Sequence, residues 1–187
     1  PAHMDMRLEF DEQYGMIAPP TRALIHRLAE LGQLYERVQR YVDETQQTKA
    51  SLHLAAQSLC YFLANELHAH CELVSAWDRT WHAQVEGDGG RPLTLQRLAS
   101  CTHEPVMRMR LMSTIVASCE HAHGGALVST IHTYTLTGHP FIRRYTAAML
   151  DHVSRPFFHT LSRWLYYGEL DDPFSEFFVR SATAPTE

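Results

Sequence analysis

The sequence lacks the features that mark membrane-spanning, secreted or nucleic-acid-binding proteins. No stretch reaches the roughly 18 consecutive apolar residues that a transmembrane helix needs, and no signal peptide is visible. Arginine and lysine together number 16 against 21 acidic residues, which gives a net charge of −5 with neutral histidines. Because this balance leaves no basic stripe that could follow a phosphate backbone, we expect neither a nucleic acid nor a membrane as partner.

Cysteine is also scarce. The four cysteines are Cys60, Cys71, Cys101 and Cys119, and none belongs to a CxxC pair. Three of them lie within apolar helical patterns, where a free cysteine behaves as a small hydrophobic residue. We therefore expect free thiols in a reducing compartment and no disulfide framework.

Recognisable catalytic motifs are missing too. The sequence contains no GxSxG elbow, no Walker loop and no dinucleotide fingerprint. The glycine-rich segment 87–90 follows an expected helix and not a strand, so it lacks the context of a phosphate-binding loop. The sequence thus singles out no catalytic residue and no cofactor site, and we predict that the protein is not an enzyme.

Histidine, by contrast, is abundant, with 13 residues, and this raises metal binding as an alternative. Glu66 and His70 are four residues apart on one expected helix face, and Cys119 precedes two more histidines near a helix end. A metal site needs three or four converging ligands, and the HExxH order is absent. We assign no metal ligand, but a histidine-rich helical metal-binding protein built on Glu66, His70 and Cys119 remains the alternative.

Helical periodicity dominates what the sequence does contain. Apolar residues recur three or four positions apart, as Leu59, Leu63 and Leu67 do, and this is the period of an amphipathic helix. No alternating strand pattern of useful length and no internal repeat accompany it. The length of the helical segments predicts an all-α fold made of an elongated antiparallel helical bundle or bundles. The predicted helices cover residues 20–43, 48–84, 93–100, 105–120, 126–136 and 141–167.

Proline and glycine mark the expected helix ends. Pro140 suits the first turn of the last long helix, and Gly168 should end that helix. Pro156 lies inside it and should kink it without ending it. Asp172 and Pro173 have the pattern of a helix cap followed by a first-turn proline.

We divide the chain into four parts. The first four residues resemble a remnant of an expression vector, and the chain has no natural-looking ends, so we expect a fragment of a longer protein. The expected parts are a vector-derived remnant (1–4), a flexible N-terminal segment (5–19), a helical domain (20–180) and a disordered tail (181–187).

An unusual density of aromatic and acidic residues marks the segment 164–179, W-L-Y-Y-G-E-L-D-D-P-F-S-E-F-F-V. Such a segment must dock on the bundle or on a partner. It resembles the pattern W-(I/L)-Y-x-G-E-L-x-D-P-(Y/F)-x-E-F-F-V near the end of the grip1 region in gamma-tubulin complex components. Residues 124–135 are similar to the GG-x-L-x-S-x-(I/V)-H-x-Y-T block of that family. Residues 137–141 and 153–157 resemble its T-G-D-P-(Y/F) and V-S-x-P segments, with His139 in place of the usual acid.

The resemblance covers about residues 20–180 and is best to the component 3 branch of the family. It singles out motif residues with a structural or interaction role, and none with a catalytic, cofactor or metal role. These motif residues are Gly124, Gly125, His132, Tyr134, Pro140, Pro156, Trp164, Tyr166, Gly168, Glu169, Leu170, Asp172, Pro173, Glu176, Phe177 and Phe178.

The resemblance also implies a function. Family members are helical rods whose N-terminal grip1 region contacts neighbouring components side by side and whose C-terminal half binds gamma-tubulin. It therefore implies lateral assembly with other components, component 2 above all, for microtubule nucleation, and gamma-tubulin binding only through a C-terminal half absent here. The implied location is the cytoplasm and cytoskeleton, at a microtubule-organising centre such as a centrosome, spindle pole body or basal body.

Overall fold

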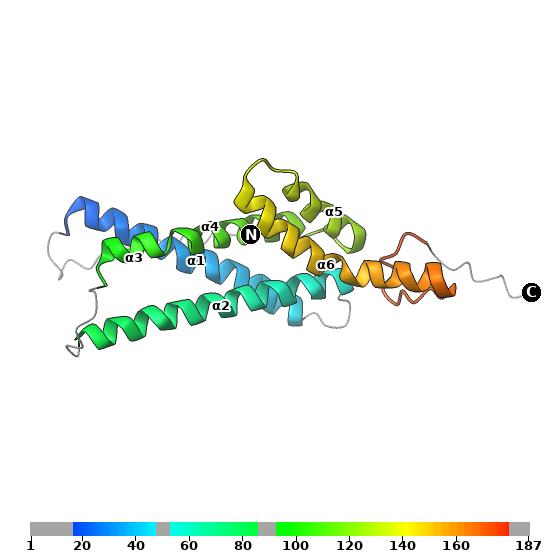
Figure 1. Ribbon diagram of the computed structural model, residues 1–187, viewed down its shortest axis with the longest axis horizontal. Coiled ribbons are helices and arrows are strands. Elements are labelled where there is room, and N and C mark those ends of the chain that lie inside the picture. The colour runs from blue at the N-terminus through cyan, green and yellow to red at the C-terminus, as the bar shows by residue number, and fades with distance from the viewer. Residues whose placement is uncertain (1–16, 48–52, 86–92, 180–187) are drawn as a thin grey trace, which may run out of the picture. The chain divides into compact units, whose positions relative to one another are not determined.

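The computed structural model describes residues 17–47, 53–85 and 93–179 (Figure 1). In these ranges the secondary structure is entirely helical, so the predicted all-α class is confirmed. None of the described helices is long and apolar enough to cross a membrane. The helices are α1 (Pro19–Gln47), α2 (Leu54–Val85), α3 (Leu95–Cys101), α4 (His103–Cys119), α5 (Gly124–Thr135) and α6 (Pro140–Tyr167).

Several helix boundaries depart from the predicted ones. The second helix begins at Leu54 and not at residue 48, the third at Leu95 and not at 93, and the fourth at His103 and not at 105. The first helix continues to Gln47 and does not end near residue 43, because no proline or glycine interrupts the polar segment that follows its apolar stripe. The fifth helix begins at Gly124 and not at residue 126, because a first turn has no intrahelical partners for its amides and so tolerates glycine. The predicted parts 1–4 and 181–187 and most of 5–19 lie outside the described residues.

Compact packing divides the chain into two units, which we describe separately. The first unit comprises residues 1–39 and 67–113, and the second comprises residues 40–66 and 114–187. Three helices, α1, α2 and α4, contribute residues to both units. The elongated antiparallel arrangement of the helices stays a prediction.

The first unit has a core of side chains from α1, α2 and α4. Its buried residues share the helical spacing that the sequence predicted, and burial of each large apolar side chain contributes about 1.5–3 kcal/mol. Polar contacts lie at its edge, where Arg37 Nη1 donates to Ser113 Oγ at 3.2 Å. The buried apolar side chains of this unit are Leu31, Val38, Leu67, Met109, Leu111 and Met112.

The second unit is built around the helical hairpin of α5 and α6. A short turn over residues 136–139 joins these helices, which pack against each other. Thr146 is fully buried in α6, and its hydroxyl donates to the Ile142 carbonyl one turn earlier at 2.8 Å, which satisfies its polar group. The side chains of this core with no exposed surface are Leu59, Leu63, Ile115, Leu127, Ile131, Met149 and Val153.

Both ends of α6 follow the predicted signals. Pro140 is the first helical residue, where its missing N–H has no intrahelical partner to lose. His139 occupies the preceding cap position and makes no side-chain cap hydrogen bond. Gly168 adopts a left-handed conformation (φ 70°) and donates its N–H to the Trp164 carbonyl at 3.0 Å, so it ends the helix as predicted.

Candidate functional site

The metal-binding alternative finds no support in the structure. In the part of the chain that the structure describes, no three histidine, cysteine or acidic side chains come together to hold an ion. Cys119 is buried, and burial raises the pKa of its thiol to about 11, whereas a metal requires the thiolate.

The segment after α6 folds back on the second unit. Arg163 on α6 donates to Glu169 at 2.7 Å and to Asp171 at 2.6 Å. These ion pairs hold the first residues after Gly168 close to the C-terminal turns of α6. Both acidic side chains are well exposed, so the pairs direct the turn more than they stabilise the unit.

Asp172 organises the next turn. Its carboxylate accepts hydrogen bonds from the backbone amides of Glu176 at 3.0 Å and Phe177 at 2.9 Å. Ser175 at the turn has φ 55°, a conformation that such a side-chain-capped turn supports. The prediction of a helix cap at Asp172 is therefore wrong, because no helix follows Pro173 in the described residues and the carboxylate closes a turn instead.

Glu176 connects this segment to the start of α2. Its Oε2 accepts a hydrogen bond from the amide of Leu54, the first residue of α2, at 2.7 Å. Its Oε1 lies 3.6 Å from Nδ1 of His53. A carboxylate at a helix N-terminus satisfies an orphan amide and interacts favourably with the helix dipole.

Gly124 makes the approach of Glu176 possible. It is buried and has φ +53°, and a Cβ atom there would lie 3.2 Å from Cβ and 3.3 Å from Cα of Glu176. Its neighbour Gly125 is exposed, and a Cβ there would meet no atom within 4 Å. The first glycine of the pair is therefore required by geometry, and the second is not.

The aromatic side chains of the segment divide into buried and exposed ones. Phe177 is only 6% exposed, and its ring contacts Phe157 (5.5 Å between centroids) and Trp164 (5.9 Å). Phe178 also contacts Trp164 but stays 68% exposed. The expectation that this segment docks on the bundle is confirmed for Phe177, whose ring packs against the C-terminal part of α6.

Together these residues form what we call the tail junction: Gly124, Pro156, Asp172, Glu176 and Phe177. All five line one small cavity of about 20 Å³, although they come from three separate parts of the sequence.

The other motif residues lie elsewhere in the second unit. Tyr134 contacts Ser118 at 2.6 Å between hydroxyl oxygens. Those with exposed side chains are His132, Pro140, Tyr166, Glu169, Pro173 and Phe178, and Leu170 is half-buried.

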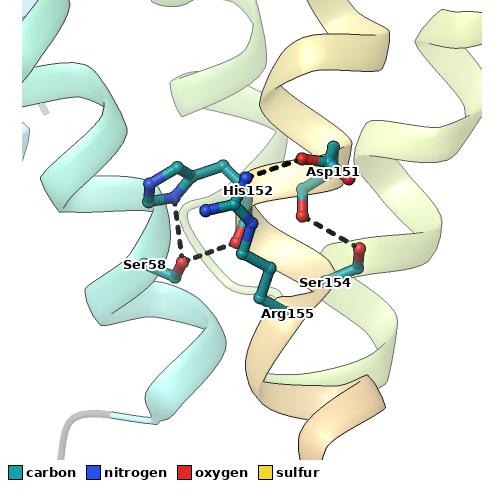
Figure 2. Close-up of polar contacts among 5 residues, drawn as sticks. All are labelled: Ser58, Asp151, His152, Ser154 and Arg155. Atoms are coloured by element: carbon teal, nitrogen blue, oxygen red, sulfur yellow. Dashed lines mark hydrogen bonds and ion pairs between the residues drawn. The ribbon is translucent and has the colours of Figure 1, made fainter.

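Pro156 bends α6 and removes one of its backbone hydrogen bonds. The helix α6 continues through Pro156, and Figure 1 shows its axis changing direction between its gold and orange parts. Because proline has no N–H, the carbonyl of His152, four residues earlier, loses its usual helical donor. Figure 2 shows the replacement: the Ser58 hydroxyl on α2 donates to that carbonyl at 2.8 Å.

The same hydroxyl lies 3.2 Å from Nδ1 of His152. A serine next to a histidine is also found in nucleophilic sites, but here the single hydroxyl hydrogen of Ser58 is given to the carbonyl. The ring nitrogen must then donate to the serine oxygen and cannot accept its proton. The pair therefore joins α2 to α6 structurally, with the imidazole of His152 stacked on Tyr61 at 5.5 Å.

Reasoning from the sequence missed the partners of these motif residues. Glu176 was singled out by the resemblance, but nothing in the sequence pointed to Leu54, and Ser58 was not singled out at all. A signal for Ser58 did exist: a proline inside a helix predicts a carbonyl in need of a donor. Which residue supplies that donor depends on the tertiary fold.

Comparisons with known proteins agree with this description. A family model for the gamma tubulin complex component N-terminal region matches residues 2–186. The chain is similar to Gamma-tubulin complex component 3 of Homo sapiens, with 38% identity over 161 residues, 83% of this chain and 17% of that protein. It is also similar to a Gamma-tubulin complex component 3 homolog of Xenopus laevis (34% over 171 residues, 88% and 18%). A third relative is Spindle pole body component alp6 of Schizosaccharomyces pombe (26% over 170 residues, 82% and 20%). The chain spans about a fifth of the length of these curated relatives.

Proposed function

Because this chain belongs to the gamma-tubulin complex component family, we propose that it is a structural part of a gamma-tubulin complex that assembles side by side with neighbouring components. In this role it supports microtubule nucleation at a microtubule-organising centre, within the cytoplasm and cytoskeleton. The neighbour that we propose is component 2. Gamma-tubulin itself is expected to bind a part of the protein beyond these residues.

An exposed apolar face on α2 carries this proposal. Val74, Trp81 and Val85 are 43%, 48% and 68% exposed, and their spacing of seven and four residues places them on one side of the helix. Trp77, at the intervening position, is half-exposed. Tryptophan is enriched among the residues that dominate binding energy at protein interfaces, and exposed apolar side chains in a row favour a protein partner.

The rim of this α2 face is polar and charged. His82 and Asp78, which border Trp81 on the same helix, lie 3.4 Å apart, and both are exposed. An apolar centre with a charged rim is the usual anatomy of a specific protein interface. The rim charges would select the partner and its orientation more than they would add affinity.

We propose no catalytic function. The Ser58–His152 pair, the one nucleophile-like contact that we describe, has its hydroxyl hydrogen committed to a carbonyl. Such an arrangement favours a scaffold that resists bending at the proline of α6.

The test is a pull-down with the purified N-terminal half of component 2 as bait and gamma-tubulin as a second bait. We expect the chain to be retained by component 2 and not by gamma-tubulin alone. Trp81→Ala should weaken retention at least about tenfold, because loss of a central interface tryptophan commonly costs 2 kcal/mol or more. Leu136→Ala, which removes an exposed apolar side chain (72%) outside α2, is the matched control.

Two results would contradict the proposal. One is failure of the unmodified chain to bind any component of the complex. The other is equal retention of the unmodified chain and the Trp81→Ala variant, which would show that the α2 face is not part of the interface. Circular dichroism of both variants should be measured alongside, so that loss of binding is not mistaken for loss of structure.

A further inference from the structure

A basic cavity lies in the first unit, and none of its lining residues belongs to α2. Its volume is about 40 Å³, and it is lined by residues of α1, α3 and α4 and by Thr102 between the last two helices. Three of its lining residues can carry positive charge: Arg27 on α1, and His103 and Arg110 on α4. Leu28, Val106 and Met107 form an apolar part of its wall. The cavity thus combines an apolar wall with cationic groups.

The charges around this cavity are unbalanced. Within the first unit, α1, α3 and α4 carry six arginines against three glutamates, although the chain as a whole has a net charge of −5. Two of these glutamates already bind arginines: Glu30 is bidentate to Arg110 at 2.6 and 2.7 Å, and Glu104 binds Arg108 at 2.7 Å. At the cavity itself, Arg27 and Arg110 are balanced by the single carboxylate of Glu30, so one positive charge remains in excess.

Arg27 is the cationic group of the cavity that can bind a ligand. Its guanidinium makes no hydrogen bond or ion pair to a described residue, and its effect on Glu30 is a weak Coulombic one, smaller than that of Arg110. The bidentate pair with Glu30 holds Arg110 in place beside it. His103 is the first residue of α4, so the positive end of that helix adds to the field at the same point.

We infer that this cavity binds a carboxylate side chain of an acidic peptide segment in a partner protein. A glutamate fits both parts of the site, because its methylene stem can lie on Leu28 and Met107 while its carboxylate meets Arg27 and His103. A guanidinium offers paired donors that match the two oxygens of a carboxylate. The thioether of Met107 adapts its shape to different stems.

The apolar wall argues against a phosphate group as the occupant. A phosphate presents three strongly accepting oxygens that need several donors around them, and Leu28, Val106 and Met107 offer none from their side chains. The inference stands on this cavity and does not depend on the lateral contact proposed for α2.

Fluorescence anisotropy with a defined probe tests it. The probe is a fluorescein-labelled peptide in which glutamates alternate with leucine and glycine, and the control peptide has glutamine at each glutamate. We expect the chain to bind the acidic peptide and not the glutamine peptide. Arg27→Gln should weaken binding about tenfold, as loss of a charge-assisted hydrogen bond does. Arg79→Gln, on α2 of the same unit and outside the cavity, should change it by less than about twofold.

Three outcomes would overturn the inference. Equal binding of the two peptides would show that the carboxylate is not recognised. Equal weakening by Arg27→Gln and Arg79→Gln would show attraction by overall charge without a site. Full competition by inorganic phosphate at millimolar concentration, or tighter binding to vesicles with anionic headgroups than to the peptide, would assign the cavity to phosphate. Arg27 is exposed, so its replacement leaves the fold intact.

Discussion

The carboxylate of Glu176 accepts a hydrogen bond from the backbone amide of Leu54 at 2.7 Å, although 122 residues separate them in the chain. This contact joins the segment after α6 to the start of α2, within the second unit. It gives a physical reason for the glutamate in the family motif, because a charge-assisted hydrogen bond at a helix N-terminus is stronger than one between neutral groups.

Replacing Glu176 with alanine should therefore destabilise the second unit. We expect the free energy of unfolding to fall by about 1–3 kcal/mol, because the amide of Leu54 loses its acceptor in a partly buried position. Urea denaturation followed by circular dichroism measures the change. Glu169→Ala is the control, since the side chain of Glu169 is 63% exposed, and it should have little effect. Equal losses for the two variants would contradict the capping role.

The two adjacent glycines at the start of α5 should respond differently to alanine. Gly124→Ala places a Cβ atom on a left-handed residue against Glu176, so it should cost about 1–2 kcal/mol from the backbone conformation alone. Gly125→Ala meets no neighbouring atom and should be neutral or stabilising by up to about 1 kcal/mol. Thermal unfolding of the two variants compares them directly. A stable Gly124→Ala variant would refute the close approach.

Ser58 and Pro156 should be energetically coupled. When Pro156 is retained, Ser58→Ala leaves the His152 carbonyl without a donor, and the free energy of unfolding should fall by about 1–2 kcal/mol. Pro156→Ala restores a backbone N–H four residues after His152, so the serine becomes less necessary. A double-mutant cycle, measured by urea denaturation, should give a coupling of about 1 kcal/mol. Additive effects of the two substitutions would show that Ser58 does not replace the missing donor.

The four thiols should fall into two classes of reactivity. Cys71 and Cys101 are exposed, whereas Cys60 and Cys119 are buried. Near pH 8, a thiol reagent such as Ellman's reagent should label the first two in the native protein and the other two only after unfolding. Mass spectrometry of the labelled peptides identifies them. Rapid labelling of Cys119 in the native protein would contradict its burial.

Alkaline pH should weaken the second unit. Burial raises the pKa of the Cys119 thiol from 9.0 to about 11, and burial also raises the pKa of Cys60 and of Tyr41. A raised pKa in the folded state means that the unfolded state loses its proton first as the pH increases. The contribution to stability is therefore complete below pH 9 and is lost as the pH rises toward 11. Unfolding free energies measured across this range should fall less steeply in Cys119→Ala than in the unmodified chain.

Much of the secondary structure was predictable because it depends on near neighbours. The stripe that contains Leu59 and Leu63 predicted a buried helix face, and both side chains are fully buried. Pro140 and Gly168 predicted the two ends of α6, because each residue type has a backbone preference that acts within one turn. The pattern at Asp172 predicted a cap but led to a wrong expectation of helix geometry after it, because the same carboxylate can close a non-helical turn.

The tail junction could not be predicted in the same way. The resemblance named Gly124, Asp172 and Glu176 as motif residues, but their contacts join segments that are distant in the sequence. Glutamate at position 176 is compatible with a solvated side chain as well as with a helix cap. Only the backbone of α5 passing within van der Waals distance of Glu176 decides between the two.

The sequence by itself determined the all-helical class, the positions of the helices and the family, because periodicity and motifs are properties of consecutive residues. The tertiary structure alone decided which groups satisfy one another: Ser58 with the carbonyl left open by Pro156, and Glu176 with the first amide of α2. The physical reason is that a buried polar group requires a partner, but any suitable donor or acceptor in the chain meets that requirement. The packing of the apolar stripes selects the one that comes within reach.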